Sequence, residues 1–99
     1  MDKDTLNLVL KTNWYELIKA GTKKEEYREL TNYWERRLCF FPYEKRQPRN
    51  FITVCFHKGY TNEKLLLECN GIEIGPGRPE WGAKPGKTYF KIKLGKEIK

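Results

Sequence analysis

The first part of the chain alternates between strand-like and helix-like hydrophobic patterns. Leucines alternate with less apolar neighbours over residues 6–10, which is the period of a strand with one buried face. A short helix is predicted next, with Asn13 as its N-cap, Glu16 three residues later in the capping-box position, and Gly21 just past its end. A second short strand is predicted over residues 24–28.

A second helix is predicted to follow, and the pattern then dissolves into a loop. Thr31 or Asn32 can cap this helix, which carries Trp34 and Leu38. Residues 39–50 contain two prolines and several basic and aromatic residues, with neither helical nor strand periodicity. We therefore expect the two helices of the protein early in the chain, followed by an irregular loop.

The second half of the chain reads as β structure. Residues 52–57 and 65–69 are predicted to form an antiparallel hairpin, and Asn70-Gly71 is predicted to form a tight turn. Strand periodicity continues over residues 72–74, residues 75–82 read as an irregular loop, and residues 89–94 form the clearest strand. This last strand places three apolar residues on one face: Phe90, Ile92 and Leu94.

Five or six short strands with two early helices predict an α+β fold, a small and partly closed β-barrel. The absence of regular βαβ alternation argues against a doubly wound sheet. The length of 99 residues fits one domain, residues 1–99, built around a single small core.

Charge and cysteine content narrow the function classes. The chain has 20 Lys and Arg against 13 Asp and Glu, a net charge of +7, which makes a polyanion the first ligand to test. No apolar run approaches the roughly 18 residues of a membrane span, and the N-terminus lacks the pattern of a signal peptide, so we expect a cytoplasmic protein. Three scattered cysteines and one histidine predict neither a metal site nor a disulfide framework, and no cofactor motif is present.

The segment after the first predicted helix concentrates side chains that can do chemistry. In a strand Lys24, Glu26 and Arg28 project from the same face, and Lys23 in the preceding turn can lean over the same opening. Cations hold phosphate or carbonyl oxygens, and a carboxylate between them fixes their positions or moves a proton. A solvated surface run of charges is the alternative interpretation.

Basic and aromatic residues are interleaved after this segment. Residues 1–30 hold six basic and six acidic side chains, whereas residues 31–64 hold seven against three. Exposed aromatic side chains that alternate with cations are typical of single-stranded nucleic acid binding. We predict that Tyr43, Arg46 and Arg49 are exposed and contact nucleic acid, and that Trp34 and Phe51 belong to the core.

Trp81 lies within a Gly- and Pro-rich loop that lacks the Lys-Ser/Thr pair of a P-loop. The large apolar ring can line a binding cleft as a stacking platform, or it can plug the end of the barrel. We predict Trp81 as a nucleic-acid-binding residue and keep the plug as an alternative.

The residues around the charged segment resemble the signature of the ASCH domain family, which is G-x-K-x-x-E-x-R after a short helix. The residues that carry this resemblance are Trp14, Leu17, Ile18, Gly21, Lys23, Glu26 and Arg28. The resemblance extends over about residues 6–95, which look like the small ASCH proteins common in bacteria and prophages. It implies a PUA-like β-barrel with a cleft lined by the motif residues, and binding of RNA. Some members of the family are ribonucleases acting on single strands, and a related branch hydrolyses the acetyl amide of N4-acetylcytidine.

From the resemblance we expect an RNA-binding domain with a cleft formed by Lys23, Glu26 and Arg28, in which Lys23 and Arg28 contact phosphate and Glu26 mainly orients Arg28. A metal-independent ribonuclease, with Lys23 and Glu26 as catalytic residues, is the alternative. The amidohydrolase branch carries a threonine where this chain has Glu26, together with a later glutamate that corresponds to Glu68 or Glu73. Because Glu26 offers no hydroxyl, we rank that activity lower.

Overall fold

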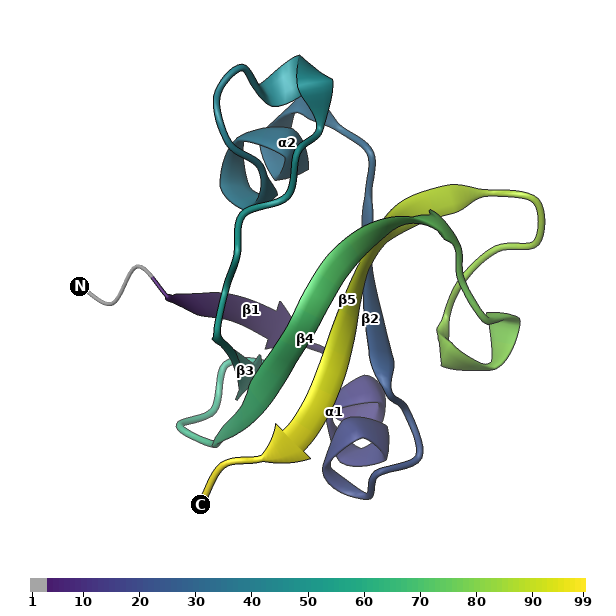
Figure 1. Ribbon diagram of the computed structural model, residues 1–99. Helices are drawn as coiled ribbons and strands as arrows, with labels where there is room; N and C mark the ends of the chain where they lie inside the picture. Colours follow the sequence, from purple (N-terminus) through teal and green to yellow (C-terminus); the bar gives the residue numbers. More distant parts are fainter. Residues whose placement is uncertain (1–3) are drawn as a thin grey trace.

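The computed structural model describes residues 4–99, which form a curved mixed sheet with two α-helices (Figure 1). Two single-turn 3-10 helices, η1 (Tyr43–Lys45) and η2 (Pro79–Trp81), lie in the connecting segments. The elements in chain order are β1 (Thr5–Leu10), α1 (Thr12–Lys19), β2 (Glu25–Glu29), α2 (Asn32–Leu38), β3 (Thr53–Lys58), β4 (Lys64–Pro76) and β5 (Thr88–Glu97).

The five strands run in the order β1-β3-β4-β5-β2. β1 and β3 are parallel, and every other neighbouring pair is antiparallel, including the predicted β3–β4 hairpin. No strand ladder joins β1 to β2 in the described part of the chain, so these two strands are the edges of a half-barrel. The prediction of an α+β fold with two early helices is therefore confirmed.

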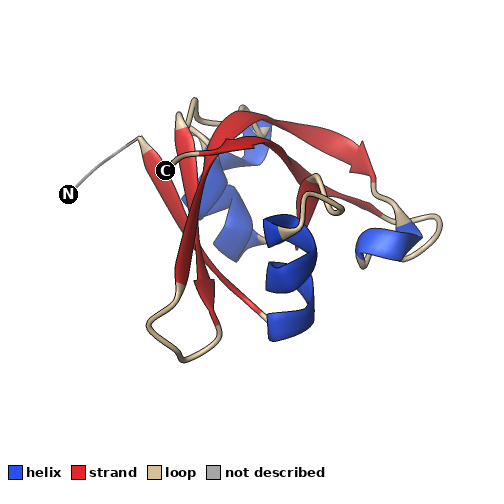
Figure 2. Cartoon of the chain, turned by 90° about the horizontal axis from the view of Figure 1, so that it is seen from below, coloured by secondary structure: helices blue, strands red, loops and turns tan. Residues whose placement is uncertain are grey.

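The core lies on the concave face of the sheet. Figure 2 shows the strands arching over the helices, and Figure 1 places α1 and α2 near opposite ends of the sheet. The helices contribute buried residues to the same cluster as the strands, because their apolar stripes face inward. The largest fully buried side chains are Tyr15, Phe56, Phe90, Leu8, Leu38, Ile92, Val54 and Cys39.

The ends of the two helices test the capping predictions. Asn13 is wrong as the first N-cap, because α1 begins at Thr12 and its N-cap, two residues before Asn13, is Lys11, whose side chain makes no capping bond. Gly21 does follow the helix end, with a φ of +80° that favours glycine. Thr31 is confirmed as the cap of α2, since its Oγ1 accepts a hydrogen bond from the Trp34 N–H at 3.3 Å.

The predicted turn at Asn70-Gly71 is wrong. β4 continues through it, and the pairing of β4 with β5 shifts register between Leu67 and Cys69 and again between Cys69 and Ile72. Such bulges add residues to one strand and bend it, which lets one long strand follow the curved core. The sheet therefore has five strands, the lower of the two numbers predicted.

The loop predicted over residues 39–50 contains η1 and a single bridge between Cys39 and Pro48. Phe51 is buried in the core as predicted. Trp34 is only partly buried and packs against the core from outside. None of the helices in residues 4–99 has the length and apolar character needed to cross a membrane.

Candidate functional site

Two charged residues of β2 occupy the concave face of the sheet. In the antiparallel register Glu26 lies opposite Ile92, and Arg28 lies opposite Phe90. Directly opposed residues share a face, and both β5 residues are fully buried. The core face of the sheet therefore ends, at its β2 edge, in a carboxylate and a guanidinium group.

Lys23, Glu26 and Arg28, which we call the motif residues, form one connected ion-pair network. The Lys23 Nζ lies 3.0 Å from Glu26 Oε1, and the Arg28 Nη1 donates to Glu26 Oε2. Only 7% of the Glu26 side chain is exposed. The prediction that a lysine, a glutamate and an arginine converge is thus confirmed for these three residues, but not for Lys24. That residue precedes β2 and is exposed.

Lys23 is enclosed beneath the network. Its side chain is 1% exposed, its Nζ donates to the carbonyl of Trp81 at 2.7 Å, and it lies between the rings of Trp14 and Tyr27 at 5.1 and 5.0 Å from their centroids. Burial lowers the pKa of the Lys23 ammonium, while the neighbouring Glu26 opposes that shift. Lys23 thus ties the motif to the η2 segment, 58 residues later in the chain.

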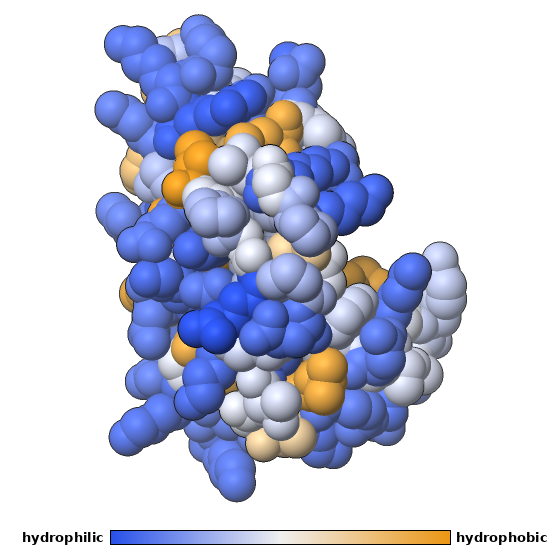
Figure 3. Space-filling model, turned by 90° about the vertical axis from the view of Figure 1, so that its right-hand side faces the viewer, coloured by the Kyte–Doolittle hydropathy of each residue, from blue (hydrophilic) through white to orange (hydrophobic). Residues whose placement is uncertain are grey.

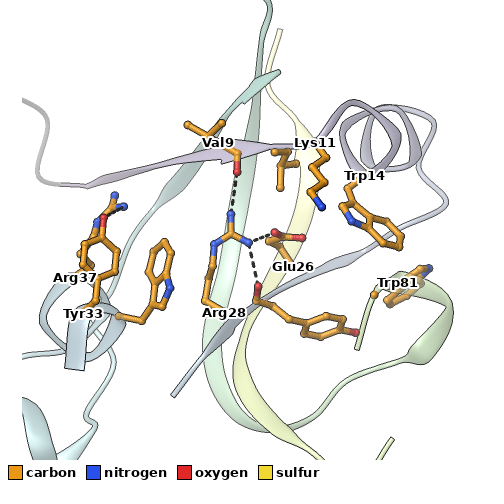
Figure 4. Close-up of a pocket in the computed structure, with 12 residues that line it drawn as sticks. Val9, Lys11, Trp14, Glu26, Arg28, Tyr33, Arg37 and Trp81 are labelled. Carbon is orange, nitrogen blue, oxygen red and sulfur yellow. Dashed lines mark hydrogen bonds and ion pairs between the residues drawn. The ribbon is translucent and has the colours of Figure 1, made fainter. Parts of the chain in front are cut away.

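Arginine side chains occupy the open edge of β1. Arg28 Nη2 donates to the Val9 carbonyl at 3.1 Å, and Arg37 Nη2 from α2 donates to the Asn7 carbonyl at 2.9 Å. Alternate carbonyls of an edge strand point away from its partner, so the two guanidinium groups bind backbone that a neighbouring strand would otherwise bind. Arg28 thereby bridges the gap between β1 and β2, as Figure 4 shows.

A cavity of about 490 Å³ lies at this gap, and we call it the edge cavity. Glu26 and Arg28 are at its centre in Figure 4, with Tyr33 and Arg37 on one side and Trp14 and Trp81 on the other. Arg28 and Arg37 each lie 5.1 Å from the ring of Trp34. The lining residues are Val9, Leu10, Lys11, Trp14, Glu26, Tyr27, Arg28, Tyr33, Trp34, Arg37, Trp81 and Gly82.

The structure separates the predicted nucleic-acid residues. Arg28 and Trp81 line the edge cavity, whereas Tyr43, Arg46 and Arg49 do not. These three are half-buried: Arg46 pairs with the buried carboxylate of Glu35 at 2.6 Å, and Arg49 lies over the ring of Phe51 at 5.0 Å. Lys23, which was predicted to contact phosphate, does not line the edge cavity either, and its side chain is 1% exposed.

Neither later glutamate lines the edge cavity. Glu68 accepts a hydrogen bond from the Lys96 N–H at 3.1 Å, and Glu73 forms an ion pair with Lys93 at 3.0 Å. Both are on β4, away from the gap between the edge strands. The motif carboxylate, Glu26, is the acidic side chain that the edge cavity presents.

Several lining residues were not predicted as site residues. Lys11, Trp14 and Tyr33 reach the cavity because α1 and α2 flank the gap on either side. The sequence signal that they share is their position at the starts of the two helices that precede and follow the motif strand, and Trp14 is in addition one of the residues that resemble the family signature. Arg37 is one of the basic residues of the 31–64 region, but its contact with the β1 edge depends on the packing of α2.

The edge cavity combines one carboxyl group, that of Glu26, with several hydrogen-bond donors and aromatic rings. Glu26 can accept hydrogen bonds from N–H groups, since each carboxylate oxygen has two acceptor sites. Lys11 and Arg28 can donate to anionic or carbonyl oxygens. The Lys11 Nζ makes no ion pair within residues 4–99. Within the same range no three His, Cys, Asp or Glu side chains gather as a metal site would require.

Comparisons with protein-family models, curated proteins and solved structures found no match to this chain.

Proposed function

We propose that the protein is an RNA-binding domain of ASCH type that holds an unpaired nucleotide in the edge cavity. The observation that carries the proposal is the arrangement of aromatic rings and guanidinium groups around one buried carboxylate. Unpaired bases stack on aromatic side chains and on guanidinium planes, and their edges hydrogen-bond to polar groups. The cavity offers all three kinds of contact within one opening.

The aromatic walls supply the stacking surfaces. Tyr33 is 59% exposed and packs edge-on against Trp34, with 4.9 Å between the ring centroids. Trp14 and Trp81 line the opposite side. A base that enters between the two sides exchanges water for ring contact, a gain of about 1–3 kcal/mol per stacked base.

The polar floor supplies the selection. Glu26 presents an acceptor to the amino or imino N–H groups of a base, the role that glutamate plays toward the cytosine amino group in nucleic-acid readout. Arg28 and Lys11 supply donors for base carbonyls or a phosphate. Arg28 is held by Glu26, the Tyr27 carbonyl and the Val9 carbonyl, so its plane is fixed before a ligand arrives.

The motif residues also support the proposed kinship. G-x-K-x-x-E-x-R spans only eight positions, yet its three charged residues meet at one site that faces a cavity. A surface run of charges, the alternative interpretation, leaves its members in solvent. We propose a PUA-like barrel for the fold, in which Arg28 bridges the gap between the edge strands and Arg37 joins α2 to the edge of β1.

A ribonuclease built on the same cavity is the second candidate. Glu26 lines the cavity and lies 3.0 Å from a buried ammonium, and such a carboxylate can take a proton from an attacking 2′-hydroxyl. Because Lys23 is buried, we propose that it holds Glu26 in place and does not contact the ligand. The amidohydrolase chemistry remains the lower-ranked form, because Glu26 replaces the threonine hydroxyl.

The binding test uses fluorescence anisotropy with labelled single-stranded RNA and two matched tyrosine variants. Tyr33→Ala removes a ring at the cavity, whereas Tyr60→Ala removes a fully exposed ring on the β3–β4 connection. We expect Tyr33→Ala to weaken binding about 5-fold or more, since one stacked base contributes at least about 1 kcal/mol. Tyr60→Ala should leave the affinity unchanged.

A gel of the same RNA incubated without added metal separates the two candidates. Intact RNA that migrates as a complex supports binding alone, and cleavage that disappears in Glu26→Gln, assayed at a temperature where circular dichroism shows this variant to be folded, supports the ribonuclease. Equal affinities for the two tyrosine variants would place the ligand elsewhere. Absence of any RNA binding at low salt would refute the proposal, because phosphate contacts are strongest there.

A further inference from the structure

We infer that a bound RNA strand leaves the edge cavity across Trp81 and continues into a second, basic cavity beside it. This inference rests on the proposed function and deepens it, because it assigns the path of the nucleic-acid backbone. The second cavity, about 460 Å³ in volume, is here called the side cavity. Its lining residues are Lys24, Glu25, Asn70, Arg78, Trp81, Lys93 and Leu94.

The two cavities share Trp81. This residue lines both of them, so it lies at the boundary between them. The boundary is held in place from below: the Trp81 carbonyl accepts from Lys23 at 2.7 Å, and the Arg78 N–H donates to the hydroxyl of Tyr27 at 2.9 Å. Burial raises the pKa of Tyr27 to about 12, so this hydroxyl stays neutral at ordinary pH.

The charge of the two cavities fits a polyanion. The edge cavity contributes three cations and one carboxylate, and the side cavity contributes three more cations and one carboxylate. Six cations against two carboxylates leave an excess of four positive charges, more than half of the net charge of +7 of the chain. Figure 3 shows the side of the molecule that carries the segment between β4 and β5, where hydrophilic residues predominate.

The cations of the side cavity are available to phosphate. Lys24 is exposed and makes no ion pair within residues 4–99. Arg78 lies 4.9 Å from the Trp81 ring and 3.7 Å from Glu80, and both members of that ion pair are more than 60% exposed. Lys93 pairs with the exposed Glu73. Exposed pairs contribute little stability, so a phosphate can replace the carboxylates.

The predicted basic loop, residues 39–50, offers fewer available cations to an RNA backbone than the side cavity does. Arg46 is engaged by the buried Glu35, Arg49 lies over the ring of Phe51 at 5.0 Å, and the ring of Tyr43 is itself covered by Arg36 of α2 at 5.7 Å. No residue from 39 to 50 lines either cavity. A strand whose base occupies the edge cavity therefore meets the next basic surface at the side cavity.

Two triple variants with the same change in net charge test the path. The track variant is K24Q/R78Q/K93Q. The loop variant is K45Q/R49Q/K64Q, which removes two cations of the 39–50 loop and one at the start of β4, all outside both cavities, and leaves the Arg46–Glu35 pair intact. Circular dichroism and thermal melting of both variants first establish that each is folded.

Binding is measured by anisotropy with single-stranded RNA about twelve nucleotides long, within the range of site sizes for such proteins, over a series of salt concentrations. The track variant should bind at least about 10-fold more weakly. Its slope of log affinity against log salt should fall by about 2, since each lost phosphate contact removes about 0.7. The affinity for nucleoside monophosphates, which fill the edge cavity alone, should not change in the track variant.

The possible outcomes distinguish failure of the assigned RNA path from failure of the proposed RNA-binding function. Equal loss in the track and loop variants, or a larger loss in the loop variant, overturns the assigned path while wild-type binding leaves the proposed function standing. Loss of monophosphate binding in the track variant also overturns it, because the side cavity would then belong to the nucleotide site itself. A wild-type protein that binds neither probe overturns both proposals.

Discussion

The substitution Glu26→Gln removes the charge that links the motif residues while keeping the length of the side chain. In the native protein the carboxylate lies between Lys23, 1% exposed, and Arg28, 15% exposed. The glutamine can still accept a hydrogen bond from one of them. It leaves the buried ammonium of Lys23 without an opposite charge.

Removing one partner of a buried ion pair costs about 3–5 kcal/mol. The lower end applies here, because glutamine preserves one hydrogen bond and Arg28 keeps the Val9 and Tyr27 carbonyls as acceptors. We therefore expect a loss of about 3 kcal/mol in the free energy of unfolding at pH 7. For a domain of this size each kcal/mol shifts Tm by roughly 4–8 °C, so Tm should fall by at least about 12 °C.

The loss should depend on pH in a defined direction. Burial already lowers the native pKa of Lys23, and Glu26 opposes that shift, so Glu26→Gln lowers it further. Between the native pKa and the unfolded value of about 10.4, the unfolded chain binds more protons than the native one. Stability then rises with pH. The deficit of Glu26→Gln should therefore shrink as pH increases from 7 toward 10.

Thermal melts and urea titrations followed by tryptophan fluorescence and circular dichroism measure the loss. Glu73→Gln is the control, since it removes an equal charge from the exposed pair with Lys93, where less than about 1 kcal/mol is expected. The double variant K23M/E26Q should recover part of the stability lost in Glu26→Gln. A Tm for Glu26→Gln within about 4 °C of wild type, or a deficit that grows with pH, would refute the buried-pair reasoning.

Further predictions concern the packing of the η2 segment and the α2 connection. Gly77→Ala should lower stability by about 1–3 kcal/mol in urea titrations, because a Cβ there would lie 2.7 Å from Tyr27 Cζ; Gly75→Ala, whose Cβ meets a lysine side chain at 3.6 Å, is the matched control with little loss. Arg46→Ala should cost about 1–2 kcal/mol by the same measurement, since it leaves the buried Glu35 carboxylate without its charged donor. Equal urea midpoints for Gly77→Ala and Gly75→Ala, or a urea midpoint for Arg46→Ala equal to that of the wild type, would contradict these assignments.

The local elements could be predicted because their signals are local. Leucine alternation predicted β1, and the Phe90, Ile92 and Leu94 alternation predicted β5; in both strands the inward positions are buried or partly buried. Gly21 and Thr31 predicted a helix end and a helix start from the chemistry of capping. The failure at Asn70-Gly71 has a tertiary cause, since that dipeptide serves either a turn or a bulge, and the curvature of the sheet decides which.

The candidate site could be predicted only in part, for a similar reason. The spacing of the motif brought Glu26 and Arg28 to one strand face, and Lys23 next to them. The sequence did not show that Lys23 would be enclosed by Trp81, or that Arg28 would bind the Val9 carbonyl. These contacts join segments that are far apart in the chain, and periodicity within a segment carries no information about them.

The amino-acid sequence by itself determined the class of the elements, the excess of positive charge and the cluster of one carboxylate with two cations. Hydrophobic periodicity and side-chain charge are properties of each segment, and they hold in any arrangement of the segments. The tertiary structure decided that β1 and β2 become the edges of an open sheet. That strand order places a cavity between the edges and buries Glu26 beside the core, because the pairing of β2 with β5 turns its polar face toward the same side as Ile92 and Phe90.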